Sequence, residues 1–195
     1  MRVFVALYPD NVFKRHLRDL LKESQKFKSY LRFTHVDQIF MTIKFLGDSI
    51  TDKTFEIYAE ELGKRISDFP SFEVTPAELA FGYKYQIRPK VLILNVEENK
   101  YLDELTQYAT DAAKTINPHD IISKKELKKH IHHITIGRPK KTPSKSEGKK
   151  IKEYIENIDS YSLPFTVDKV HLIKSTLTAQ GPIYKTLKSY PLIVK

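Results

Sequence analysis

The segment His133-Ile134-Thr135-Ile136 alternates polar and apolar residues with the period of two that is typical of a β-strand. His133 and Thr135 are therefore predicted to share one face, with the two isoleucines packed behind them. An imidazole and a hydroxyl side by side can contact one phosphate oxygen, and the imidazole can also move a proton near neutral pH. The alternative interpretation of so short a pattern is a histidine with a structural role.

A second segment, Phe40-Met41-Thr42-Ile43-Lys44-Phe45-Leu46-Gly47, has a related layout. Strict alternation predicts that Thr42 and Lys44 share a face with Phe40. The other side chains of the alternation are then expected behind that face: Met41, Ile43 and Phe45. The two segments differ in one respect, because an aromatic ring stands where the first segment has its imidazole.

Strand and helix patterns follow one another irregularly along the 195 residues. There is no regular βαβ rhythm and no glycine-rich phosphate loop, which predicts an α+β fold with antiparallel sheets, and residues 1–195 are interpreted as one domain. The segment Pro139–Lys150 is rich in lysine and is predicted to be a loop. Strands are expected near 2–8, 30–34, 39–46, 72–81, 91–96, 131–138, 165–175 and 183–194. Helices are expected after Asp10 or Asn11, after Ser49 or Thr51, and around 101–116 and 151–158.

The composition limits the classes of partner. Lysine and arginine number 33 against 24 for aspartate and glutamate, a net charge of +9. This excess favours nucleic acid, because contacts to phosphates release counterions; a solvated lysine surface is the alternative. The absence of cysteine excludes disulfides and a cysteine nucleophile, and favours a cytoplasmic location. No apolar run is long enough to cross a bilayer, and MRVFVALYPD is typical of a first strand and not of a signal peptide.

Taken together, the ordered motifs resemble those of the two-histidine phosphoesterases. The resemblance is to the LigT-like branch, known as 2′-5′ RNA ligases or RNA 2′,3′-cyclic phosphodiesterases, and it covers essentially the whole chain. The branch has a first motif similar to H-I-T-L-K-F-L-G and a second similar to P-H-I-T-L-A-R. The matching stretches here are the opening strand RVFVALYP, Arg32, Met41–Gly47, RPKVLILNV, His133–Arg138, and the closing set Leu172, Ser175, Leu177, Gly181 and Tyr184.

The resemblance implies a bilobal fold in which two antiparallel sheets face each other across a central cleft, with helices packed outside. It implies a catalytic role for three residues: His133 as the base that activates water, and Thr42 and Thr135 as phosphate contacts. It also implies substrate contact by Arg138, a partner that is an RNA end or nucleotide carrying a cyclic phosphate, and no metal or organic cofactor. A monomer that does not bind membranes is expected.

Phe40 departs from the family pattern, which has the acidic histidine at this position. A phenyl ring cannot donate a proton, and losing one general acid lowers a rate by roughly 10²–10⁴. Phe40 is predicted either to stack on a base or ribose of the substrate or to fill the space of the lost imidazole. His35 and Lys44 are the alternative proton donors, and Lys44 is otherwise predicted to face phosphate.

Three functions stay open at this point. The first is an RNA 2′,3′-cyclic phosphodiesterase that forms 2′-phosphates and is impaired by Phe40. The second is a non-catalytic protein that binds RNA ends or nucleotides, and the third is a phosphodiesterase acting on another nucleotide. The cluster His130-Ile131-His132-His133 suggests a metal site, but His132 and His133 are expected to point apart. His16 and His171 are interpreted as surface or packing residues.

Overall fold

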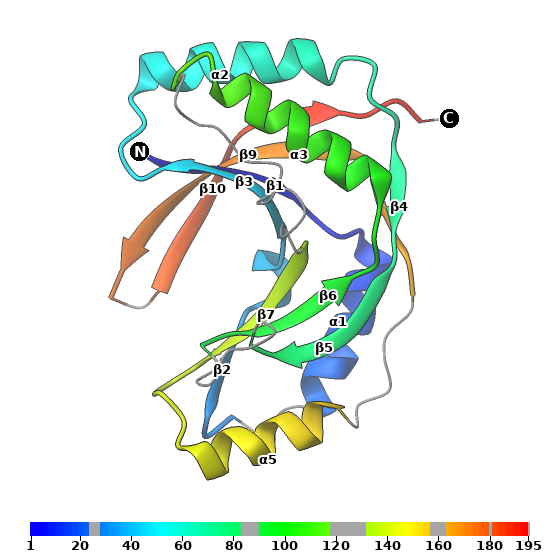
Figure 1. Cartoon of the computed structure of the whole chain (residues 1–195), viewed down its shortest axis with the longest axis vertical. Helices are drawn as coiled ribbons and strands as arrows, with labels where there is room; N and C mark the ends of the chain where they lie inside the picture. The colour runs from blue at the N-terminus through cyan, green and yellow to red at the C-terminus, as the bar shows by residue number, and fades with distance from the viewer. Residues whose placement is uncertain (24–27, 83–89, 118–131, 157–162, 180, 195) are drawn as a thin grey trace.

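A curled antiparallel sheet forms the centre of the molecule (Figure 1). The computed structural model describes residues 1–23, 28–82, 90–117, 132–156, 163–179 and 181–194. Within these residues the strands follow the order β10-β9-β1-β3-β7-β6-β5, and β2 pairs with β7. Their bounds are β1 Arg2–Leu7, β2 Leu31–Phe33, β3 Met41–Gly47, β5 Pro76–Phe81, β6 Leu92–Val96, β7 His133–Pro139, β9 Lys169–Thr178 and β10 Gly181–Pro191.

The helices pack on the outside of this curl (Figure 1). α2 and α3 cover the part of the sheet that contains β1 and β3, and α5 lies against β5 at the opposite end. A small second sheet pairs β4 with β8. The remaining bounds are α1 Asn11–Glu23, the 3-10 turn η2 Val36–Gln38, α2 Asp52–Arg65, β4 Phe72–Val74, α3 Lys100–Ala113, α5 Lys145–Glu156 and β8 Phe165–Val167.

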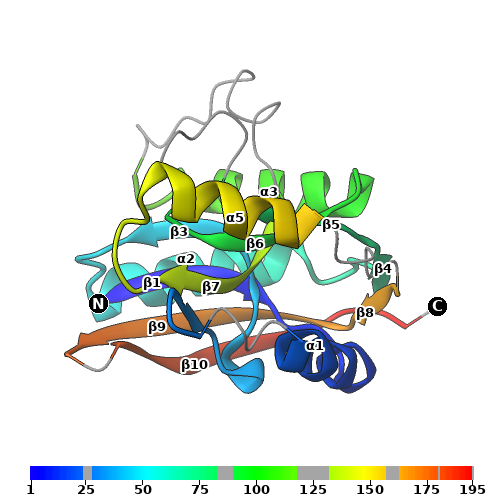
Figure 2. The same ribbon diagram turned by 90° about the horizontal axis from the view of Figure 1, so that it is seen from below.

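Two halves of the sheet meet at a single residue pair. Met41 of β3 pairs with Ile134 of β7, and both side chains are fully buried. One half contains β10, β9, β1 and β3, with β9 and β10 side by side at its edge (Figure 2), and the other contains β7, β6, β5 and β2. The predicted α+β class with antiparallel pairing and outer helices is confirmed. The two sheets expected from the resemblance are joined through this pair into one curved sheet.

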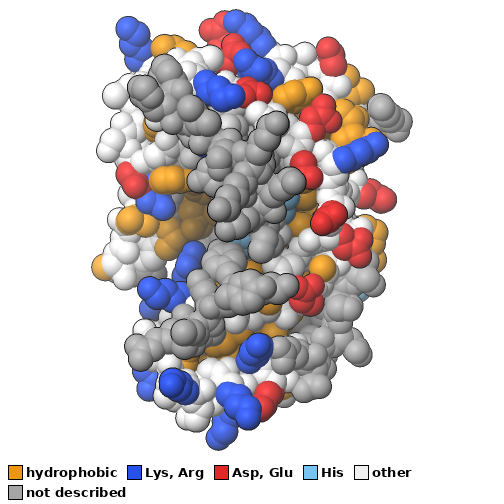
Figure 3. Space-filling view, viewed as in Figure 1, with side chains coloured by type: hydrophobic (Ala, Val, Ile, Leu, Met, Phe, Trp, Pro, Cys, Tyr) orange, Lys and Arg blue, Asp and Glu red, His pale blue; other side chains and the backbone are white. Residues whose placement is uncertain are grey.

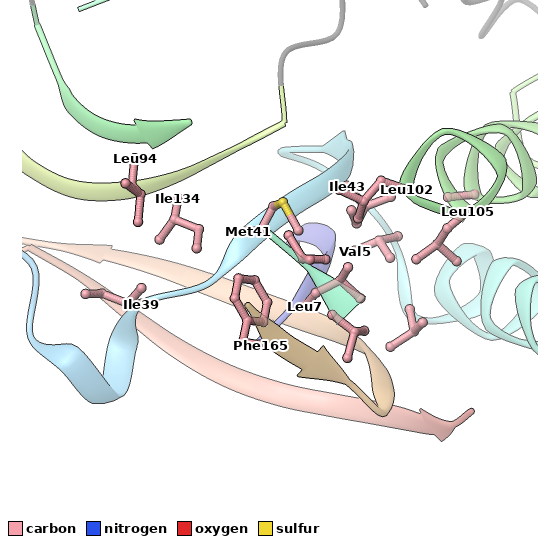
Figure 4. Packing of buried hydrophobic residues seen from close by; sticks show 14 of the residues in the cluster. Val5, Leu7, Ile39, Met41, Ile43, Leu94, Leu102, Leu105, Ile134 and Phe165 are labelled. Atoms are coloured by element: carbon pink, nitrogen blue, oxygen red, sulfur yellow. The ribbon is translucent and has the colours of Figure 1, made fainter. Parts of the chain in front are cut away.

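The main hydrophobic core lies between the sheet and the helices. Val5, Met41 and Ile134 point into it from three neighbouring strands, and Leu102 and Leu105 meet them from α3 (Figure 4). These side chains are almost completely buried. The core crosses the junction of the two halves, so burial of apolar area stabilises the curvature as well as each half.

Side-chain caps set the starts of the helices. The Asp10 carboxylate accepts a hydrogen bond from the Phe13 amide at 2.8 Å, and the Thr51 hydroxyl accepts one from the Thr54 amide at 3.1 Å, which confirms both predicted starts. The predicted loop Pro139–Lys150 is wrong in its second half, since α5 begins at Lys145. Ser144 and Glu147 form a reciprocal capping box there, at 3.2 and 2.8 Å. Among the described residues no helix is long and apolar enough to span a membrane.

Candidate active site

The sheet has an inner face, opposite the main core, on which the motif residues gather. In β1 the alternation is clear: Phe4 and Ala6 pack with Ile173 of β9 in a second cluster, separate from the core residues Val3, Val5 and Leu7. We call the side that carries Phe4 and Ala6 the inner face. Figure 3 shows a shaded hollow with hydrophobic side chains at mid-height on the left, and lysine and arginine side chains just below it.

The junction between the halves brings the two motifs together on this face. Met41 and Ile134 pair directly and point into the core, so their chain neighbours point the opposite way. Phe40 and Thr42 flank Met41 along the chain, and His133 and Thr135 flank Ile134. The four motif residues therefore point from the junction to the inner face.

A bulge in β3 breaks the predicted alternation after Ile43, which is still buried in the main core as predicted. Thr42 pairs with Ala6 on the inner face, but the register shifts there, and Lys44 pairs with the fully buried Val5. Residues directly opposite in a ladder point to the same face. The prediction that Lys44 shares a face with Thr42 and Phe40 is therefore wrong, because alternation cannot show an extra residue in one strand. The predicted contact of Lys44 with phosphate loses the support of that shared face.

The same bulge turns Phe45 to the inner face. Phe45 pairs with Phe4, its side chain is 42% exposed, and the Arg2 guanidinium carbon lies 4.6 Å from its ring centroid. The alternation placed this ring behind the strand, which is wrong for the same reason. Arg2, which is ion-paired with Asp48, thus lies at the inner face beside Phe45, a placement that the motifs did not predict.

A second bulge, in β7, orients Arg138. Thr135 pairs with Ile93 of β6, whereas the next pair joins Gly137 to Leu92, so β7 holds one extra residue at this point. Strict alternation from Thr135 would turn Arg138 toward the core. The extra residue restores Arg138 to the side of His133 and Thr135.

Strand β2 supports that placement of Arg138. Arg138 pairs with Arg32, and the next pair joins Pro139 to Leu31, whose side chain is buried in the main core. Both guanidinium groups consequently lie on the inner face, where two like charges side by side favour an anionic ligand. Gly137 allows this close approach, because a Cβ there would lie 3.0 Å from the Arg32 carbonyl oxygen.

Phe40 is enclosed by aromatic rings. Its ring stacks on Phe4 with 5.0 Å between centroids, and it meets Tyr184 edge-on at 4.9 Å and Tyr8 edge-on at 6.0 Å. These arrangements are the ones that aromatic pairs prefer. The wall around Phe40, the position that the resemblance assigns to the first histidine, is thus aromatic, and it contains two phenol groups that the motifs did not identify as part of the site.

His133 lies beside a polar pair on β6. It pairs directly with Asn95, whose amide nitrogen donates a hydrogen bond to the Glu78 carboxylate at 2.8 Å. His132 is turned the other way: it is buried, and its Nε2 lies 3.5 Å from an Asp103 carboxylate oxygen of α3. The side chains of His132 and His133 therefore point in different directions, as predicted.

A metal site at residues 130–133, which the strand alternation already disfavoured, receives no support from the part of the chain that the structure describes. No group of three histidine, aspartate or glutamate side chains able to hold a metal occurs in those ranges, and His130 lies outside them. His16 is exposed on α1. His171 packs edge-on against Tyr8 at 5.0 Å, which confirms the predicted packing role, and burial, with help from the Lys169 charge, lowers the pKa of His171.

The inner face can therefore hold one phosphoryl group. The hydroxyls of Thr42 and Thr135 are hydrogen-bond donors for non-bridging oxygens, the imidazole of His133 can accept a proton, and Arg138 can offset negative charge. The structure brings these four residues to one face, and Lys44 is the predicted site residue that it leaves out.

Comparison with known proteins agrees with this fold and set of motifs. A family model described as LigT like Phosphoesterase matches residues 98–184. An RNA 2′,3′-cyclic phosphodiesterase of Thermotoga maritima is 32% identical over 188 residues, which cover 96% of this chain and 93% of that protein. A protein of the same name from Methanocaldococcus jannaschii is 26% identical, with 97% of this chain and 100% of that protein covered.

Solved structures show the same architecture at low sequence identity. A protein of Thermus thermophilus superimposes with a TM-score of 0.78 at 18% identity, covering 98% of this chain and 97% of its own. The E. coli LigT complex with 3′-AMP gives 0.71 at 16% identity, covering 98% and 96%. Fold and motifs together define a two-histidine phosphoesterase. The chain belongs to the LigT-like phosphoesterase family.

Proposed function

We propose that this protein hydrolyses the 2′,3′-cyclic phosphate at RNA ends or on nucleotides and leaves a 2′-phosphate. The observation that carries the proposal is the gathering of His133, Thr42 and Thr135 on one face of the sheet, with Arg138 turned to the same side by a bulge. The names of the Thermotoga and Methanocaldococcus relatives support this substrate class. E. coli LigT, which shares the fold, has been crystallised with 3′-AMP, ATP and phosphate.

The roles of the side chains follow from their chemistry. The His133 imidazole takes a proton from water as the water oxygen attacks phosphorus. The hydroxyls of Thr42 and Thr135 donate to the non-bridging oxygens, and hydrogen bonds to charged groups contribute about 1.5–3 kcal/mol each. Arg138 offsets the charge that builds up on the phosphoryl group. These are acid–base and electrostatic functions of the chain's own residues.

Turnover is expected to be slow. The family's acidic histidine is replaced by Phe40, whose ring is held between Phe4, Tyr8 and Tyr184. The sequence left two roles open for Phe40, stacking on the substrate or filling the space of the lost imidazole, and this packing supports the second. An aromatic ring in place of the acid also favours the second candidate function, a protein that binds RNA ends or nucleotides without cleaving them.

One experiment separates the two functions. An oligonucleotide ending in a 2′,3′-cyclic phosphate is incubated with the natural chain, with His133→Ala and with His16→Ala, and the 2′-phosphate product is quantified by chromatography. We expect slow turnover that falls at least about 100-fold in His133→Ala, the usual effect of losing a general base. His16→Ala, which removes an exposed histidine from α1, is expected to match the natural chain.

Equal rates with and without His133 would contradict the hydrolase. Calorimetric titration with a cyclic nucleotide then decides the alternative: binding without turnover would identify the binding protein, and neither binding nor turnover would exclude both functions.

A further inference from the structure

The wall around Phe40 contains other groups that carry a transferable proton. Hydrolysis of a cyclic phosphate needs an acid on the side of phosphorus opposite the base, to protonate the departing ribose oxygen. The two alternatives drawn from the sequence do not meet this need. His35 is 74% exposed at the start of η2 and its Nδ1 lies 3.4 Å from an Asp37 carboxylate oxygen, while Lys44 pairs with Val5 on the core side.

Two inner-face groups near Phe40 are engaged elsewhere. The Tyr8 side chain interacts with Thr186 of β10, which partly offsets the rise that burial causes in the pKa of Tyr8. The His171 Nδ1 lies 2.9 Å from the Ser189 hydroxyl, and its ring packs on the side of Tyr8. His171 therefore meets Phe40 only through Tyr8, and the Tyr8 hydroxyl is directed to the edge strand.

Tyr184 is placed differently, because its ring reaches across the sheet. It belongs to β10, which is separated from β3 by β9 and β1 in the strand order. The ring nevertheless meets Phe40 at 4.9 Å and Phe4 at 5.9 Å, with interplanar angles of 89° and 90°. This contact across two intervening strands agrees with the curl of the sheet, and it places the half-buried Tyr184 ring beside Phe40, the position that the resemblance assigns to the family's imidazole.

Positive charges from both halves of the sheet act on the same phenol. Burial raises the pKa of Tyr184, while Arg138 of β7 and Arg2 of β1 oppose that rise. Two consequences follow. The hydroxyl lies within the field of Arg138, the residue that the β7 bulge turns to the phosphate side, and it keeps its proton at neutral pH, as an acid must.

We infer that the Tyr184 hydroxyl is the general acid of this chain and protonates the leaving ribose oxygen in place of the missing imidazole. The inference rests on the proposed function. Water attacks phosphorus and gives a proton to His133, the bond from phosphorus to the 3′-oxygen breaks, and its electron pair takes the phenolic proton. The products are a 2′-phosphate and a 3′-hydroxyl, and the phenolate regains its proton from the imidazolium or from solvent. The transfer is favourable because a ribose alkoxide is a stronger base than a phenolate.

Substitution of a single oxygen tests the inference. Tyr184→Phe keeps the ring contacts and removes only the hydroxyl, and its kcat on the cyclic-phosphate oligonucleotide is compared with that of the natural chain. We expect kcat to fall about 10- to 100-fold with KM unchanged, the range for a moderate general acid. Tyr190→Phe is the control on the same strand, since the Tyr190 hydroxyl donates to the Ala59 carbonyl on α2 and not to the inner face.

The double variant Phe40→His, Tyr184→Phe distinguishes an acid from a structural group. Once an imidazole can donate the proton, the phenol is redundant, so adding Tyr184→Phe to Phe40→His should leave kcat nearly unchanged. An equal loss in both backgrounds would show that the hydroxyl serves packing or binding. An unchanged kcat in Tyr184→Phe alone, with turnover still dependent on His133, would overturn the inference and leave the proposed function standing. If the protein shows no turnover, or turnover that is the same in His133→Ala, both the inference about Tyr184 and the proposed hydrolase function would be overturned.

Discussion

Replacing Phe40 by histidine should supply the acid that the motif resemblance assigns to this position, and we propose that it raises kcat. If the phenol of Tyr184 already supplies part of the proton transfer, the gain is smaller than the full effect of a general acid, and we expect about 10- to 100-fold. The dependence of kcat on pH should change as well. A second imidazole acts as an acid only while it is protonated, so kcat should fall above the pKa of that imidazole and the pH–rate profile should become bell-shaped.

The same substitution should lower stability, by an amount that the ring contacts set. Phe40 makes three aromatic contacts, with Phe4, Tyr8 and Tyr184. Each such pair contributes about 0.5–1.5 kcal/mol beyond area burial. An imidazole is planar and keeps part of these contacts, so we expect the free energy of unfolding to fall by about 1–3 kcal/mol, within the range of ordinary core substitutions.

Two measurements on two variants check this reasoning. Single-turnover hydrolysis of the cyclic-phosphate oligonucleotide gives the rate, and urea denaturation gives the free energy of unfolding. Phe40→Leu is the matched control: it loses the same ring contacts without gaining an acid, so stability should fall and the rate should not rise. A folded Phe40→His protein with no gain in rate would refute the role assigned to this position.

Three further predictions follow from the packing of the sheet and from the pKa of His171. Ile134→Ala should lower the free energy of unfolding by about 2–5 kcal/mol in urea, because it opens a cavity where the two halves of the sheet join; a loss below about 1 kcal/mol would contradict the importance of that junction. Gly137→Ala should cost about 1–3 kcal/mol and raise KM, because the new methyl group would lie 3.0 Å from the Arg32 carbonyl oxygen and push β2 away from Arg138; normal KM and stability would refute this tight approach. Burial lowers the pKa of His171, so the folded state binds fewer protons than the unfolded chain, and stability should fall as the pH drops below about 6.5. His171→Gln should flatten that fall in urea titrations at successive pH values, and an unchanged slope would assign it to other groups.

The alternation of residues in the sequence was sufficient to predict much of the site. A period of two placed His133 and Thr135 on one face. Residues that commonly cap helices, Asp10 or Asn11 and Ser49 or Thr51, stand just before apolar patterns with helical spacing, and they predicted where two helices start. Local rules succeed here because the β pleat and the helix start depend on neighbours along the chain. The resemblance of ordered motifs then predicted the family, which the comparisons confirm.

Tertiary structure decided what local periodicity cannot encode. The two bulges reverse the expected faces of Lys44 and Phe45 and turn Arg138 inward, because an extra residue in one strand is defined only by its pairing with another. The curvature of the sheet brings Tyr184 of the edge strand into contact with Phe40, although the two residues are 144 positions apart in the sequence. The side chains beside the proposed phosphate site are thus placed by register and curl, while the sequence alone determines which chemical groups are present to be gathered there.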